Sequence, residues 1–184
     1  RKQLGIGDGT LVLLLVAHQL EIKGAPVLIR VMQRLKAAGH TNLHLLLVGS
    51  RRRNQRVERM IKVSGITDKI TQVGSVTDTR PYYAACDIYA HPTLFDACGL
   101  VVLEAMACGL PVISSPVAGS HELITQNESG YIMPHALDES FLIETILKLR
   151  DSQLREKIGR AARAAVEEQT IDHCYQQYID LYEE

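Results

Sequence analysis

Short apolar runs alternate with amphipathic stretches along most of the chain, and this alternation restricts the folds open to it. The apolar runs lie at residues 11–17, 43–48, 70–73, 88–91, 111–114 and 130–133. Stretches with apolar residues three and four positions apart separate them, at residues 25–38, 55–64, 80–85 and from 100 onward. Uninterrupted apolar strands are typical of parallel sheets that helices cover on both faces. The pattern therefore predicts a three-layer α/β domain with a parallel sheet.

The remainder of the chain, from Asp138 to the end, keeps a helical spacing of apolar residues throughout. Breaks near Asp151 and Thr170 divide it into two or three predicted helices. With 184 residues and 46% hydrophobic content, the chain can bury its apolar surface as one domain. We expect residues 1–184 to form a single domain with C-terminal helices.

Charge and cysteine content exclude several classes of function. The 20 basic and 21 acidic side chains give a net charge of −1, so the chain has no global field for nucleic acid. The four cysteines lack Cys-x-x-Cys spacing and histidines at metal-ligand intervals, so we expect reduced core thiols, a cytoplasmic location and no metal site. The run at 11–17 is too short to span a bilayer.

Two carboxylates, Asp96 and Glu104, lie eight positions apart around the predicted start of a helix. Gly99 lets the backbone there approach a ligand closely. The amides that point out of this helix end are expected to be those of Leu100, Val101 and Val102. With the helix dipole behind them, they would bind a pyrophosphate.

The two acids would bracket this phosphate site, since Glu104 lies about one helical turn beyond its start and Asp96 lies in the loop before it. Carboxylates accept hydrogen bonds from sugar diols, which suits a ribose at one end and a hexose at the other. The alternative is a buried strand and helix with two solvated acids. Ligands of such sheets bind at the carboxyl ends of the strands, where Gly49, Gly74 and His91 also fall.

Several short motifs occur in the order found in one enzyme family. They are Lys23-Gly24, Leu47-Val48-Gly49, Val73-Gly74, Tyr82-Tyr83, His91-Pro92-Thr93 and the segment 95–113. In that segment an acid, seven residues and a glutamate precede Ala-Met-Ala-Cys-Gly-Leu-Pro-Val. The chain thus resembles the carboxyl-terminal, Rossmann-like half of family-4 glycosyltransferases of the GT-B fold, especially those that build the lipopolysaccharide core.

The resemblance implies that this half binds a nucleotide-sugar donor, that an amino-terminal half binds the acceptor, and that transfer retains the anomeric configuration. Lys23 matches the lysine at the donor pyrophosphate, Glu104 the ribose-binding acid and Asp96 the acid facing the donor sugar. The phosphate-binding backbone matches Cys98, Gly99, Leu100 and Val101. The base would contact the backbone from Gly74 to Val76, and Gly49 completes the donor-binding set.

Two positions depart from the family pattern. Asp96 replaces the usual glutamate, which draws the carboxylate back by about one methylene and leaves the preferred sugar open. His18 replaces an arginine five residues before Lys23, so the second cation would depend on pH, because histidine changes charge near neutrality. We expect donor affinity to weaken as the pH rises past neutrality. The alternative is that His18 bonds a strand-end carbonyl.

A basic cluster follows the second apolar run. It comprises Arg51, Arg52, Arg53, Arg56 and Arg59. A solvated face is one explanation, and contact with donor phosphates, an anionic acceptor or lipid headgroups of the inner membrane is the other.

The sequence therefore predicts the donor-binding half of a retaining glycosyltransferase, with Lys23 and Asp96 in catalytic roles. Its donor would be a nucleoside-diphosphate sugar, UDP-glucose by analogy, with no cofactor. The chain opens with Arg1, so we expect it to be part of a longer protein whose acceptor domain lies outside it. A glycan or glycolipid would be the acceptor. Two alternatives remain: half of a nucleotide-sugar epimerase or hydrolase, and a non-catalytic binding module.

Overall fold

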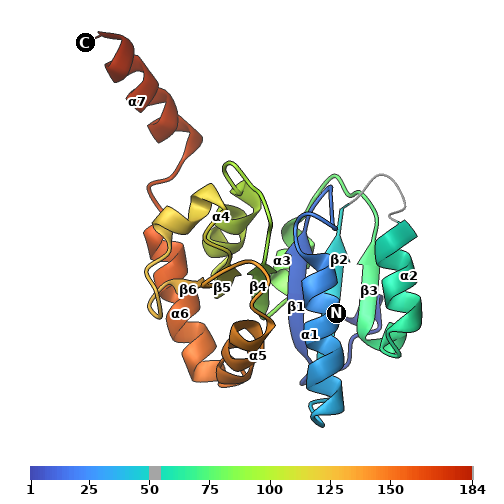
Figure 1. The fold of residues 1–184 in the computed structure, drawn as a ribbon. Helices are drawn as coiled ribbons and strands as arrows, with labels where there is room; N and C mark the ends of the chain where they lie inside the picture. The colour runs from blue at the N-terminus through green and yellow to red at the C-terminus, as the bar shows by residue number, and fades with distance from the viewer. Residues whose placement is uncertain (50–54, 184) are drawn as a thin grey trace.

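A six-stranded parallel sheet organises the computed structural model, which describes residues 1–49 and 55–183 (Figure 1). The strands are β1 Leu11–Val16, β2 Leu43–Val48, β3 Ile70–Val73, β4 Ile88–His91, β5 Val112–Ser114 and β6 Gly130–Ile132. Their order in the sheet is β3-β2-β1-β4-β5-β6, so β1 and β4 are neighbours although two strands separate them in sequence. This change of direction is the topological switch point, where ligands of such sheets bind.

Seven α-helices accompany the described strands. They are α1 Ala25–Ala37, α2 Gln55–Val63, α3 Arg80–Ala85, α4 Leu100–Ala107, α5 Glu139–Lys148, α6 Ser152–Ala165 and α7 Ile171–Glu183. Short 3-10 turns lie at Lys2–Leu4, Thr67–Lys69 and Gly119–Leu123. Three layers result, as the alternation of apolar runs predicted.

The strand β1 shows how the layers form, because all six of its residues are buried. Leu11, Leu13 and Leu15 pack with apolar residues of α1, α2 and α5 on one face of the sheet. Val12, Leu14 and Val16 pack with α3, α4 and the end of α6 on the other. Successive side chains of a strand point to opposite faces, so an unbroken apolar run fills two cores.

The predicted elements agree with the structure to within one residue at most ends. β1 ends at Val16 rather than at 17, β5 begins at Val112 rather than at 111, and the chain from 138 onward forms three helices. The 3-10 turns were not predicted, since segments of three to five residues carry too few apolar positions to show a period.

The prediction of core thiols is wrong for most of the cysteines. Cys86 is buried, whereas Cys98, Cys108 and Cys174 are exposed. Cys98 lies in the loop before α4, and Cys108 follows its last turn. Burial raises the pKa of Cys86 to about 12, which keeps that thiol protonated.

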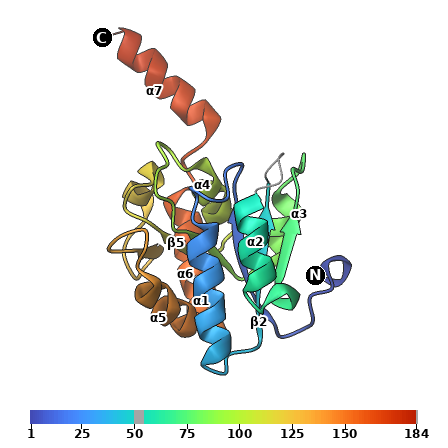
Figure 2. The ribbon, with the colours of Figure 1, turned by 45° about the vertical axis from the view of Figure 1, so that its right-hand side comes forward.

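The last helix, α7, extends away from the body of the molecule in both ribbon views (Figures 1 and 2). Its residues from 171 to 182 are all exposed, among them the apolar side chains of Tyr175, Tyr178 and Ile179. Within residues 1–49 and 55–183, no helix has both the length and the hydropathy needed to cross a bilayer.

Candidate functional site

Two adjoining hollows open at the carboxyl ends of the strands, beside the switch point between β1 and β4. The first has a volume of about 370 Å³ and includes Lys23, His91, Asp96, Cys98, Gly99 and Leu100 in its wall. The second, of about 210 Å³, includes Gly49, Ser75, Val76, Thr79 and Glu104. Both hollows are lined by Val16, Ala17, His18 and Val101, so they meet along the end of β1 and the first turn of α4.

Of the predicted donor-binding residues, only Gly74 lies outside the walls of both hollows. Its carbonyl accepts a hydrogen bond from the amide of Gly49 at 3.2 Å, which joins the ends of β2 and β3. Gly49 itself has a φ of 99°, and a Cβ there would lie 2.6 Å from the carbonyl oxygen of Ala17. Glycine is therefore required where the chain after β2 passes close to the end of β1.

Asp96 is the centre of the polar groups in the first hollow. Its Oδ2 accepts hydrogen bonds from Lys23 Nζ at 2.7 Å and from His91 Nε2 at 2.9 Å. Its Oδ1 accepts one from the Gly99 amide at 3.0 Å. Burial alone would raise the pKa of Asp96, but the bonds from Lys23 and His91 outweigh it and lower that pKa. Asp96 is therefore an ionised acceptor at neutral pH.

His91 lies behind this carboxylate and is fully buried at the end of β4. Burial lowers its pKa, although Asp96 opposes the shift. Since Asp96 accepts at Nε2, the neutral ring carries its proton there, and Nδ1 faces the hydroxyl of Tyr89 at 3.4 Å. The sequence placed His91 at the ligand edge of the sheet, but its bond to Asp96 was not predicted.

Lys23 precedes α1 and keeps part of its donor capacity. Its ammonium donates to Asp96 and to the carbonyl oxygen of Phe95 at 2.8 Å, so two of its three N–H groups are used. Gly24 beside it has a φ of 97°, and a Cβ there would lie 2.3 Å from the carbonyl oxygen of Pro92. This close contact holds the lysine against the Asp96 loop.

The start of α4 presents two free amides rather than three. The amide of Val102 donates to the carbonyl oxygen of Gly99 at 2.8 Å, because the first turn closes with a bond between residues three apart. The prediction of a free Val102 amide is therefore wrong. Within the described part of the chain, the amides of Leu100 and Val101 have no acceptor. An anion at this helix end would meet both of them.

Glu104 lies one turn further along α4, in the second hollow, and its side chain is exposed. The hydroxyl of Tyr83 donates to its Oε2 at 2.8 Å and also lies 3.2 Å from the carbonyl oxygen of Val101. The Tyr82-Tyr83 motif gave no indication of this bond. The side chain of His18 is exposed between the hollows, and no carbonyl among residues 1–49 and 55–183 bonds it, so the strand-end alternative is wrong.

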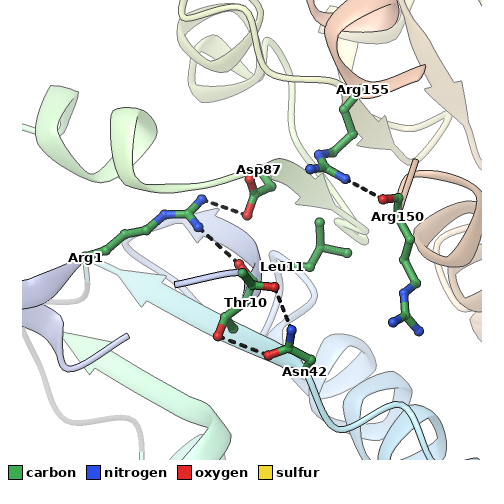
Figure 3. Close-up of a pocket in the computed structure, with 8 residues that line it drawn as sticks. Arg1, Thr10, Leu11, Asn42, Asp87, Arg150 and Arg155 are labelled. Atoms are coloured by element: carbon green, nitrogen blue, oxygen red, sulfur yellow. Dashed lines mark hydrogen bonds and ion pairs between the residues drawn. The ribbon is translucent and has the colours of Figure 1, made fainter. Parts of the chain in front are cut away.

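A third hollow, of about 200 Å³, lies at the opposite end of the sheet (Figure 3). Arg1 forms an ion pair with Asp87 at 2.8 Å and donates to the carbonyl oxygen of Thr10. Asp87 also accepts from the buried amide of Val12 at 2.8 Å. Arg155 donates to carbonyl oxygens at the end of α5. These bonds are internal and hold the strand and helix ends together.

Within the described ranges, no group of three or more histidine, cysteine, aspartate or glutamate side chains is placed to hold a metal ion. Three members of the predicted basic cluster, Arg51, Arg52 and Arg53, lie outside the described residues. Arg56, at the start of α2, forms an ion pair with Glu21.

Residues 1–165 match the family model of glycosyl transferases group 1. The chain belongs to this family. This group 1 chain is 26% identical over 183 residues to N-acetyl-alpha-D-glucosaminyl L-malate synthase of Bacillus anthracis, covering 99% of itself and 48% of that protein. It spans about half the length of the curated relatives that it matches.

Solved structures share the fold of this chain. The structure of WaaG, a glycosyltransferase involved in lipopolysaccharide biosynthesis, is 26% identical with a TM-score of 0.81, over 91% of this chain and 45% of that one. Anabaena HepE in complex with UDP-glucose is 23% identical with a TM-score of 0.85, over 100% of this chain and 51% of that one. The group 1 chain thus has the Rossmann-like fold of the carboxyl-terminal half of GT-B glycosyltransferases.

Proposed function

We propose that this chain is the donor-binding half of a retaining glycosyltransferase that moves a hexose or heptose from a nucleoside-diphosphate sugar. The observation that carries the proposal is the convergence of unused polar capacity at the start of α4. Lys23 has one N–H to spare, the amides of Leu100 and Val101 are free, and Glu104 lies one turn away. This set suits a diphosphate with a ribose beside it.

Departure of the nucleoside diphosphate builds negative charge on its β-phosphate. Lys23 and the two amides would stabilise that charge, since fixed donors aimed at a developing charge lower the barrier to reaction. His18, exposed between the hollows, is the second candidate cation. A positive charge on His18 would add to the attraction for the diphosphate.

Asp96 has a different role in this proposal. A carboxylate has about four acceptor positions, and the three bonds to Asp96 leave one of them on Oδ1. That position would accept a hydroxyl of the donor sugar and orient it. Asp96→Asn is therefore expected to lower turnover more than nucleotide affinity, because the sugar is engaged mainly during transfer.

The acceptor domain belongs to the same proposal. Apolar side chains are exposed around the first hollow, on its loops and at the first residue of α4, namely those of Ile22, Leu94, Phe95, Leu100 and Val117. A rim of this kind suits a cleft closed by a second domain, which would bind a glycan or glycolipid acceptor. Likeness to WaaG favours a role in cell-surface polysaccharide or lipopolysaccharide synthesis, at the cytoplasmic side of the inner membrane. A membrane contact through residues 51–53 stays a prediction.

Calorimetric titration of the chain with UDP, GDP, ADP and their sugar conjugates tests the proposal. We expect saturable binding of one nucleotide family and loss of most of that binding in Lys23→Met. Asp78→Asn is a matched control, since its carboxylate pairs with Arg80 outside both hollows. A folded chain that binds none of these nucleotides would contradict the proposal.

A further inference from the structure

Tyr83 joins the buried core to the exposed carboxylate of Glu104. Its side chain is 1% exposed and packs in the cluster between the sheet and α4, with its ring centroid 5.9 Å from that of Tyr89. Its hydroxyl donates a hydrogen bond at 2.8 Å to Oε2 of Glu104, a residue that lines the second hollow. The ring is thus fixed by packing and the hydroxyl position is fixed with it.

Glu104 gains order from this contact. An exposed glutamate has three rotatable side-chain bonds, and fixing them costs conformational entropy. The bond from Tyr83 fixes the carboxylate before any ligand arrives, so a ligand would not bear that cost again. Its other oxygen, Oε1, has no partner in the part of the chain that the structure describes. It remains available to an incoming donor.

The hydroxyl of Tyr83 also lies 3.2 Å from the carbonyl oxygen of Val101, whose amide is one of the two free donors. The Tyr83 hydroxyl therefore lies between Val101, whose amide would bind the diphosphate, and Glu104, whose carboxylate would bind the ribose. Burial, the neighbouring Tyr89 and Glu104 all raise the pKa of Tyr83 far above its usual value. The phenol stays a donor at every pH at which the chain would be assayed.

We infer that Tyr83 is a positioning residue that holds the Glu104 carboxylate in place for the 2′- and 3′-hydroxyls of a ribose. This inference rests on the proposed function and adds a specificity to it, namely selection of ribonucleoside over 2′-deoxyribonucleoside diphosphates. A carboxylate held at one oxygen presents a fixed pair of acceptor positions to a diol. A freely rotating carboxylate would bind a sugar with a single hydroxyl nearly as well as one with two.

The test compares ribose selectivity in the wild-type chain and in Tyr83→Phe. UDP, GDP and ADP are titrated first, and the nucleotide that binds is then compared with its 2′-deoxy counterpart. In Tyr83→Phe we expect affinity for the ribonucleotide to fall about tenfold, which corresponds to the lost order of one glutamate side chain. Affinity for the 2′-deoxy form should change little, so the selectivity should largely disappear.

Two further variants separate positioning from a merely structural role. Tyr82→Phe removes a hydroxyl from the adjacent residue of α3, and it should leave selectivity at the wild-type value. In a Glu104→Ala background, Tyr83→Phe should have no further effect on affinity, because its hydroxyl then has no carboxylate to hold. Thermal unfolding of each variant shows whether a loss of affinity comes from a loss of folded chain.

The outcomes distinguish this inference from the function on which it rests. If the wild-type chain binds none of the three nucleotides, the proposed function fails and this inference fails with it. If the wild type binds and selects ribose while folded Tyr83→Phe keeps the same selectivity, the inference alone is wrong. A wild type that binds both sugar forms equally also contradicts the inference alone.

Discussion

The two ends of the sheet carry similar charged residues but use them differently. At the amino ends, Asp87 accepts from Arg1 and from the Val12 amide, and Arg155 donates to main-chain carbonyls. At the carboxyl ends, Lys23 and Asp96 bond each other yet both keep unused capacity. The first set of bonds is internal to the fold, whereas the second leaves donors and acceptors for a ligand.

Charge in a hollow does not by itself mark a binding site. Three arginines line the amino-end hollow, and a basic cavity of this kind is easily taken for an anion site. The carboxyl-end hollows have fewer cations, but they also have free amides at a helix start. We therefore expect substitutions at the carboxyl ends to change ligand affinity, and substitutions at the amino ends to change stability.

Glu104→Ala should have the largest effect. Removing a carboxylate that accepts two hydroxyls should weaken nucleoside-diphosphate binding about a hundredfold, since hydrogen bonds to charged groups contribute roughly 1.5–3 kcal/mol each. Stability should change little, because the side chain is exposed. Calorimetry and thermal unfolding measure the two quantities. Unchanged affinity in a folded variant would remove Glu104 from the site.

Asp87→Ala should give the opposite pattern. It leaves the amide of Val12 without its acceptor at a fully buried position and breaks the ion pair with Arg1. We expect the free energy of unfolding to fall by about 2 kcal/mol, the cost of an unsatisfied buried donor. Nucleotide affinity should stay at the wild-type value. A large loss of affinity in the folded variant would erase the distinction between the two ends.

Gly99→Ala tests the start of α4 against a matched glycine at the other end of the molecule. Both Gly99 and Gly5 have positive φ values, 77° and 67°. A Cβ at Gly99 would lie 2.6 Å from Ser120 Oγ, whereas one at Gly5 would meet nothing within 4 Å. Gly5→Ala should cost about 1 kcal/mol of unfolding free energy, and Gly99→Ala about 1–2 kcal/mol with weaker nucleotide binding. Equal effects in chemical denaturation and titration would contradict this prediction.

The smallest effect concerns pH. Burial lowers the pKa of His91 below its usual 6.5, so as the pH falls below that value the unfolded chain binds a proton that the native chain excludes. Stability should therefore fall by on the order of 1 kcal/mol between pH 6.5 and 5.5. The pKa of Asp96 is lowered, so its contribution is lost only at more acidic pH.

Urea unfolding at several pH values measures this dependence in the wild type and in His91→Gln. The change in the free energy of unfolding between pH 6.5 and 5.5 should be smaller in His91→Gln than in the wild type. His44→Gln is the comparison variant, because burial lowers the pKa of His44 as well, at a site remote from both hollows. If His91→Gln keeps the full wild-type slope, a charged His91 is tolerated in the native chain.

The sheet and its order of elements were predictable because apolar runs and helical spacing are local properties of the chain. Unbroken runs such as residues 11–17 indicate strands buried on both faces, and all of β1 is so buried. The candidate site was predictable in outline for a related reason. In a parallel sheet the carboxyl ends of all strands meet at one edge, which brings Gly49 and the Asp96 loop together.

The hydrogen-bond partners could not be predicted in the same way. The bond between Tyr83 and Glu104 joins α3 to α4, and it depends on how those helices pack rather than on any spacing within them. The bond between His91 and Asp96 spans five residues, yet the turn between them follows no regular period. The use of the Val102 amide depends on how tightly the first turn of α4 closes.

The position of a bound nucleotide would show which end of the sheet binds the donor. A crystal structure of the chain grown with the nucleotide that binds in calorimetry would show it. We expect the diphosphate at Lys23 and the amides of Leu100 and Val101, with the ribose at Glu104. A diphosphate bound instead among Arg1, Arg150 and Arg155, with the carboxyl-end hollows empty, would contradict it.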